Sequence, residues 1–252
     1  SCADAPATPP AGTEATDSGG TGSGETPEES ETDAAPSEEE PLMKTVRLPV
    51  DFAQLQAEAP DIYAWLELPD TGIDDPVLQR AGADLFYNSH NAYGQYYMCG
   101  AVFSQSAYNG RNFDSPMTVL YGHSTVLGQP GAFMELNNYA DEAYFDAHRE
   151  MRVYMPDGMY VYRIFAACVH SNEHLLYCHD FSDETQFDAF FSSLTEDTSP
   201  DSHIDAEALP QAGDKVLTLS TCYSANKNLR YLVMGVLEEF VPTAEAAGRE
   251  AA

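Results

Sequence analysis

The chain contains the stretch Thr218-Leu219-Ser220-Thr221-Cys222, which is followed after a short polar loop by Arg230-Tyr231-Leu232-Val233-Met234-Gly235-Val236-Leu237. The apolar pattern of both stretches, the first of which begins at Val216, predicts two neighbouring core strands. The first strand ends on a cysteine and the second begins with an arginine, so a thiol and a guanidinium are expected side by side. A thiolate is a nucleophile, and a fixed cation favours its ionisation and hydrogen-bonds the oxygen of an attacked carbonyl. The pattern is therefore typical of an acyl-transfer site.

Apolar residues are distributed unevenly over the 252 residues. Residues 1–41 contain no Lys or Arg, no aromatic residue, and no Val, Ile, Leu or Met. Such a segment buries too little apolar surface to offset the entropy of ordering, and it is predicted to be a disordered acidic tether. Residues 42–241 suffice for one domain with a sizeable core. Residues 242–252 are expected to form a flexible C-terminal tail.

The formal net charge of −30 argues against nucleic acid and anionic membrane surfaces as partners. No run of 18 apolar residues is present, so the sequence predicts no transmembrane helix. Because the sequence starts at Ser1-Cys2 without a methionine, we expect that an N-terminal export or anchor segment precedes it. A lipid-modified Cys2 and a plain processing boundary both fit. Five cysteines leave at least one thiol free or paired between chains.

The rest of the folded part predicts many short elements. A helix interrupted at Pro60 is expected over 51–66, short helices over 132–136 and 141–147, and a longer helix over 183–194. Strands are expected over 73–78, 98–104 and 118–121, with a hairpin formed by 151–155 and 160–169. Many short strands separated by turns favour a mainly β fold, either a barrel or a sandwich, with peripheral helices.

His123 is the strongest candidate for the base that a cysteine nucleophile needs. It follows an apolar strand and a glycine in Val119-Leu120-Tyr121-Gly122-His123, where a side chain can project into a cleft. A structural or surface histidine would fit the same pattern. Likewise, Arg230 would fit an edge-strand cation paired with a surface carboxylate. Ser220 and Thr221 would line the groove or be ordinary strand residues.

Three separated segments in this order resemble the signatures of the sortases, class B most closely: Val119-Leu120-Tyr121-Gly122-His123, Thr218-Leu219-Ser220-Thr221-Cys222, and Arg230. The likeness extends over 50–240 and includes Tyr63-Ala64-Trp65-Leu66, Thr71 to Gln79, Phe86-Tyr87-Asn88-Ser89-His90 and Gly100-Ala101-Val102-Phe103. It implies an eight-stranded sortase-type β-barrel with N-terminal helices and a helix between the sixth and seventh strands, placed at 183–194. Ser124-Thr125 departs from the Asn-Met common in class B, and the loop 223–229 is this chain's own.

The resemblance also implies the chemistry. Cys222 would be the nucleophile, His123 the general acid and base, and Arg230 the group that stabilises the oxyanion. The substrate, a surface protein with a sorting signal of the Asn-Pro-x-Thr type, would be cleaved after threonine through a thioacyl-enzyme. It would pass to an amine of a peptidoglycan precursor, at the outer face of the membrane of a Gram-positive-type bacterium. Ser220, Thr221, Tyr121 and Asn88 are candidate substrate-binding residues, with Tyr177 added by analogy.

Three alternative functions remain open. A pilin-polymerising sortase would use the same site with a pilin lysine as acceptor. A non-catalytic surface-binding module would keep the fold alone, and a hydrolytic cysteine protease would transfer the acyl group to water. No cofactor is implied. Cys168, His170, His174, Cys178 and His179 lie close together but match no standard zinc spacing, and whether Cys168 and Cys178 form a disulfide stays open.

Overall fold

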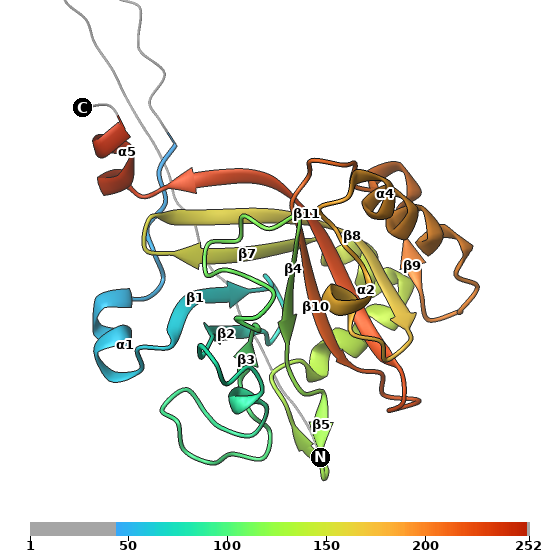
Figure 1. Ribbon diagram of the computed structural model, residues 1–252, viewed down its shortest axis with the longest axis horizontal. Helices are drawn as coiled ribbons and strands as arrows, with labels where there is room; N and C mark the ends of the chain where they lie inside the picture. Colours follow the sequence, from blue (N-terminus) through green and yellow to red (C-terminus); the bar gives the residue numbers. More distant parts are fainter. Residues whose placement is uncertain (1–43, 251–252) are drawn as a thin grey trace, which may run out of the picture. The chain divides into compact units, whose positions relative to one another are not determined.

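The computed structural model describes residues 44–250. The predicted tether over 1–41 and the last two residues lie outside the described residues. No helix of the described part has the length and apolar character needed to cross a bilayer. Figure 1 shows the described part as a β-barrel with short helices around it.

The barrel consists of eight strands in the order β11-β10-β4-β3-β2-β1-β7-β8, and it closes because β8 also pairs with β11. Closure leaves no unpaired sheet edge among these strands. Their bounds are β1 (Ile62–Glu67), β2 (Asp74–Leu78), β3 (Val102–Phe103), β4 (Met117–Tyr121), β7 (Glu150–Met155), β8 (Gly158–His170), β10 (Val216–Cys222) and β11 (Arg230–Pro242). A short strand, β9 (His203–Ile204), pairs with β8, and β5 (Thr125–Val126) and β6 (Gln129–Pro130) form a small separate hairpin. The predicted closed barrel of eight strands is therefore confirmed.

Short helices occupy the connections between strands, precede the first strand and follow the last. They are α1 (Phe52–Glu58), η1 (Phe86–Asn88), η2 (Met134–Ala140), α2 (Glu142–Ala147), α3 (Leu175–Cys178), α4 (Glu184–Ser193), η3 (Leu194–Glu196), η4 (Ala206–Ala208) and α5 (Ala244–Glu250). The helix predicted over 183–194 is α4, and it lies between β8 and β10, which are the sixth and seventh strands of the barrel. Asp183 begins it as an N-cap whose carboxylate accepts a hydrogen bond from the Gln186 N–H.

Two apolar clusters define the inside and the outside of the barrel wall. Residues from every part of the wall fill the interior, and β10 contributes Leu217 and Leu219 to it. The second cluster packs α4, through Phe187 and Phe191, against the outer faces of β4, β8, β10 and β11. Val216 of β10 belongs to this outer cluster. Because side chains alternate along a strand, Cys222 lies on the same outer face as Val216, at the end of β10.

The prediction of a helix over 51–66 is wrong for the second half of this range. Only Phe52–Glu58 is helical, and Ile62–Glu67 is strand β1, which pairs with β2 on one side and β7 on the other. Pro60 ends the helical stretch because proline lacks the N–H of a helix interior. The apolar residues that follow are buried almost continuously, as in a strand with neighbours on both sides.

Two other expectations change in extent. The strand predicted over 98–104 shortens to Val102–Phe103, because Gly100 has a φ of +60° and the chain turns there against η1. A Cβ at Gly100 would collide with the carbonyl oxygens of Tyr87 and Asn88. The end expected to be a flexible tail contains α5, whose Ala247 is buried.

Candidate active site

Cys222 and Arg230 lie directly opposite each other where β10 and β11 begin to separate. The Arg230 Nη1 is 3.8 Å from the Cys222 Sγ, and it also donates to the Leu229 carbonyl at 3.3 Å. Both side chains are half-buried. Arg230 forms no ion pair with a carboxylate of residues 44–250, whereas other arginines and lysines of this part form eleven. This guanidinium therefore faces the thiol and not a surface carboxylate.

His123 enters the same site from the end of β4. The last backbone bond between this segment and β10 runs from the Gly122 N–H to the Ser220 carbonyl at 3.2 Å. The chain then leaves the sheet, and the Phe133 N–H holds the His123 carbonyl at 3.0 Å. The imidazole Nε2 lies 2.9 Å from the Asn88 carbonyl oxygen. Because a carbonyl can only accept, Nε2 carries the hydrogen in this contact, which fixes the orientation of the ring.

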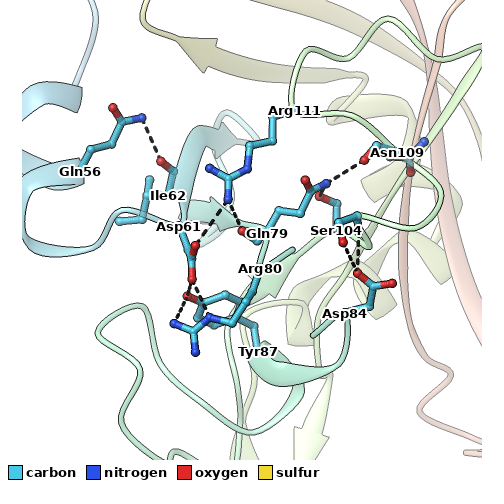
Figure 2. A network of polar contacts seen from close by, with 11 residues as sticks. Gln56, Asp61, Ile62, Gln79, Arg80, Asp84, Tyr87, Ser104, Asn109 and Arg111 are labelled. Atoms are coloured by element: carbon cyan, nitrogen blue, oxygen red, sulfur yellow. Dashed lines mark hydrogen bonds and ion pairs between the residues drawn. The ribbon is translucent and has the colours of Figure 1, made fainter. Parts of the chain in front are cut away.

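The Asn88 carbonyl belongs to η1, and a polar cluster beneath η1 holds that helix in place (Figure 2). The Asp61 carboxylate accepts hydrogen bonds from the Tyr87 hydroxyl at 2.6 Å and from the Arg80 Nε at 2.8 Å. The Arg80 guanidinium also stacks over the Phe86 ring, 3.7 Å from its centroid. Burial raises the pKa of Asp61, but the hydrogen bonds from Tyr87 and Arg80 outweigh it and hold that pKa below its usual range.

A cavity of about 280 Å³ opens beside these three side chains. Residues from six segments line it, among them Cys222, His123 and Arg230, together with Ser220, Thr221, Tyr121 and Asn88. The structure thus brings together all three predicted catalytic residues and four of the five predicted substrate-binding residues. Its walls are largely apolar, with Leu85, Phe103, Leu175 and Leu232 among the lining residues. Such a concave site with a few convergent polar groups is typical of ligand binding.

The predicted residue Tyr177 lies elsewhere. It is in α3, its side chain is 78% exposed, and it does not line the cavity in the described structure. The same segment contributes His174 instead, whose Nε2 donates to the Gln105 Oε1 at 2.7 Å and whose Nδ1 accepts from the Tyr177 N–H at 3.2 Å. His174 is the N-cap of α3 and lines the cavity, whereas the sequence singled it out only as one of the cysteines and histidines between 168 and 179.

Tyr121 offers the cavity an unused polar group. Its hydroxyl is buried and has no hydrogen-bond partner among the described residues, and its ring packs against Phe103 and His174. Burial raises the pKa of Tyr121 above its ordinary value, so the hydroxyl stays protonated at neutral pH. A buried hydroxyl without a partner is costly, and a ligand in the cavity would satisfy it.

Other cysteines and histidines of the described part form no second site. Within residues 44–250 no group of three or more His, Cys, Asp or Glu side chains is arranged to hold a metal ion. Cys168 and Cys178 are free thiols, the first buried and the second exposed. Burial raises the pKa of Cys168 to about 12, which makes it a poor nucleophile.

Known proteins match this chain in sequence and in fold. A family model described as Sortase domain matches residues 66–238. Sortase B of Listeria monocytogenes is 26% identical over 172 residues, which cover 68% of this chain and 67% of that protein. The crystal structure of sortase B from B. anthracis is 26% identical, with a TM-score of 0.62 over 75% of this chain and 84% of that chain. A class B sortase of Streptococcus pyogenes, involved in pilus biogenesis, is also 26% identical, with a TM-score of 0.61 over 75% and 98% of the two chains.

Proposed function

Given that the chain belongs to the sortase family, with class B sortases as its relatives, and is a cysteine transpeptidase, we propose that it joins surface proteins carrying a sorting signal to an amine of the cell wall. The observation that carries the proposal is the Cys222 Sγ with the Arg230 guanidinium 3.8 Å away and His123 in the wall of the same cavity. These groups supply a nucleophile, a cation for the oxyanion, and a proton donor and acceptor.

The reaction proceeds in two half-reactions. The Cys222 thiolate attacks the backbone carbonyl carbon of the threonine in the sorting signal. Arg230 donates a hydrogen bond to the carbonyl oxygen, which becomes negative. The C–N bond then breaks while His123 gives a proton to the leaving amine, which leaves a thioacyl-enzyme. An acceptor amine attacks this thioester, His123 takes up a proton from it, and the C–S bond breaks. The product is a new amide bond and free Cys222.

The test uses peptides of the Asn-Pro-x-Thr type, each incubated with the protein in the presence and absence of amine acceptors such as oligoglycine. We expect cleavage after threonine and an amide product that contains the acceptor. Cys222→Ala should abolish both, whereas Cys178→Ala, which removes another free thiol, should retain both. Cleavage at the same rate with and without an amine, and no amide product, would instead identify a hydrolytic protease.

A second acceptor is favoured by one observation, the similarity to the Streptococcus pyogenes sortase involved in pilus biogenesis. In that case a lysine of a pilin subunit would take the place of the cell-wall amine. Incubation with a candidate pilin would give a ladder of covalent multimers, and replacement of the acceptor lysine in the pilin would remove the ladder. Both versions place the protein at the cell surface, which protease treatment of intact cells would test.

A further inference from the structure

Asn137 lies in η2 and does not line the cavity. Its side chain contacts both the segment that contains Cys222 and the segment that contains His123. Its carboxamide makes three hydrogen bonds. Nδ2 donates to the Cys222 carbonyl at 3.3 Å and to the Ser124 Oγ at 3.3 Å, and Oδ1 accepts from the Ser224 N–H at 2.8 Å. Because a carbonyl only accepts and a backbone N–H only donates, these partners fix which way the amide faces.

The hydrogen bond from Asn137 to the Cys222 carbonyl takes the place of a backbone hydrogen bond that β4 does not supply. β4 and β10 run parallel, and their last pair is Tyr121 with Ser220, after which the Gly122 N–H reaches the Ser220 carbonyl. Two residues later the Cys222 carbonyl faces the same edge of β10, because orientation along a strand repeats every second residue. At the position of Cys222, the segment after β4 no longer pairs with β10. The Asn137 amide supplies the donor on the β4 side of Cys222, while β11 still pairs with Cys222 on the other side.

The bond to Ser124 extends the same support to the histidine. Ser124 directly follows His123 and is 5% exposed. The Gly131 N–H holds the Ser124 carbonyl at 2.8 Å, and the Asn137 amide holds its hydroxyl. One carboxamide therefore connects the segment that carries the thiol with the segment that carries the imidazole, which are about a hundred residues apart in the chain.

We propose that Asn137 is a positioning residue that sets the relative placement of Cys222 and His123. The inference rests on the proposed function, since it assigns Asn137 to the same acyl transfer. Catalytic groups displaced by about 1 Å lose about a hundredfold in rate, even when the cause is distant from the reacting atoms. Substrate binding depends on the cavity walls, which Asn137 does not form, so its loss should affect kcat and not KM.

The experiment compares Asn137→Ala with Asn138→Ala in the full chain. Asn138 is the adjacent residue of η2 and is exposed, so it is a matched control. For Asn137→Ala we expect kcat for transfer to fall about 10- to 100-fold with KM changed less than about twofold. Asn138→Ala should match the wild-type protein. Asn137→Asp keeps the acceptor for Ser224 but loses both donors, and it should lose kcat as well if the bonds to Cys222 and Ser124 matter.

A double-mutant cycle with Ser124→Ala separates positioning from general loosening of the fold. We expect Ser124→Ala to lower kcat in the wild-type background and to have no further effect in Asn137→Ala. Equal effects of Ser124→Ala in both backgrounds, or a wild-type kcat in Asn137→Ala, would overturn the proposal. So would a loss of kcat that follows the fraction of unfolded protein in a thermal melt.

A substrate-free measurement keeps the inference separate from the proposed function. Iodoacetamide alkylation of Cys222 is followed by peptide mass spectrometry, which separates it from alkylation of the exposed Cys178. We expect Asn137→Ala and His123→Ala to change the alkylation rate in the same direction, and Asn138→Ala to leave it unchanged. If wild-type protein transfers no peptide but this pattern holds, the proposed function fails and the positioning role stands. If transfer is observed but Asn137→Ala behaves like wild type in both assays, only the positioning role fails.

Discussion

Arg230 carries a role that its charge alone does not explain. Its guanidinium is 3.8 Å from the Cys222 Sγ, and no carboxylate of the described residues pairs with it. The alternative drawn from the sequence, a strand cation neutralised at the surface, therefore lacks its partner. A planar guanidinium can direct one N–H at the thiol and another at a developing oxyanion, which a lysine ammonium cannot do in the same fixed geometry.

Arg230→Lys should consequently lower kcat by about a hundredfold or more while the melting temperature stays close to that of the wild-type protein. The charge is retained, so the loss would be due to the lost fork of N–H groups. Arg163→Lys is the matched control, because Arg163 is a half-exposed residue of β8 that pairs only with surface carboxylates. If Arg230→Lys retained wild-type kcat, a general electrostatic role would be sufficient and the proposed role of the guanidinium would be wrong.

Asp75 is a second residue whose environment predicts a measurable effect. It lies in β2, where burial and the neighbouring Asp74 carboxylate raise its pKa to about 6. The folded state disfavours the ionised form of Asp75. Its burial therefore costs no stability below the unfolded pKa of about 4, and the free energy of unfolding decreases as pH rises from there through about 6.

Asp75→Asn removes this cost. We expect it to increase the free energy of unfolding by about 2 kcal/mol at pH 8 and to change it little at pH 4. Urea denaturation at the two pH values measures the difference. Asp157→Asn, in the exposed turn between β7 and β8, serves as the control with no pH-dependent gain. An equal change at both pH values for Asp75→Asn would show that its ionisation does not limit stability.

At the scale of elements, η1 connects the N-terminal half of the barrel to the site. Tyr87 and Asp61 hold this helix from below, and its Asn88 carbonyl orients the His123 ring. The hydroxyl of Tyr87 donates to a carboxylate that is largely buried, and hydrogen bonds to charged groups are the stronger kind.

Tyr87→Phe should therefore lower the free energy of unfolding at neutral pH by about 2 kcal/mol. Because the pKa of Asp61 is lowered in the folded state, its contribution is present above the unfolded pKa and is lost as pH falls through the folded value. The destabilisation should accordingly shrink in strong acid. Chemical denaturation across pH checks both statements, with Tyr93→Phe, at an exposed loop position, as the control. If the loss of unfolding free energy in Tyr87→Phe did not depend on pH, it would be due to lost packing and not to the lost hydrogen bond to Asp61.

Sequence reasoning succeeded where a motif and a strand end coincide. β10 and β11 were predicted with their chemistry because an apolar run ends on Cys222 and the next begins at Arg230. It failed over 62–67, where Ile62 and Leu66 fit a helical spacing as well as a buried strand. Only pairing with β2 and β7 decides between them, and those partners lie up to about ninety residues away.

Asn137 could not have been identified from the sequence at all. Nothing in the stretch around it marks an active-site residue, and its contact with Cys222 joins residues 85 positions apart. Tyr177 was assigned by analogy alone, and its exposed side chain does not line the cavity. The structure places the neighbouring His174 in the cavity wall instead.

For the whole molecule, the closed barrel explains how one small cavity collects residues from distant segments. β4, β10 and β11 are adjacent in the wall. His123 follows β4, Cys222 ends β10 and Arg230 begins β11, so all three lie at the same end of the barrel. α3 and α4 come from the long connection between β8 and β10, and α3 covers this edge from outside. The barrel therefore brings the three side chains together, and the connections supply the rest of the cavity wall.

The central claim is that Cys222 forms a thioacyl-enzyme and passes the acyl group to an amine. Mass spectrometry of the intact protein, after incubation with sorting-signal peptides and without an acceptor, tests it most directly. We predict an added mass equal to the peptide up to its threonine, located on Cys222 by peptide mapping and lost when an amine acceptor is added. A folded protein with reduced Cys222 that acquires no adduct from any such peptide, or an adduct that no amine removes, would contradict the account.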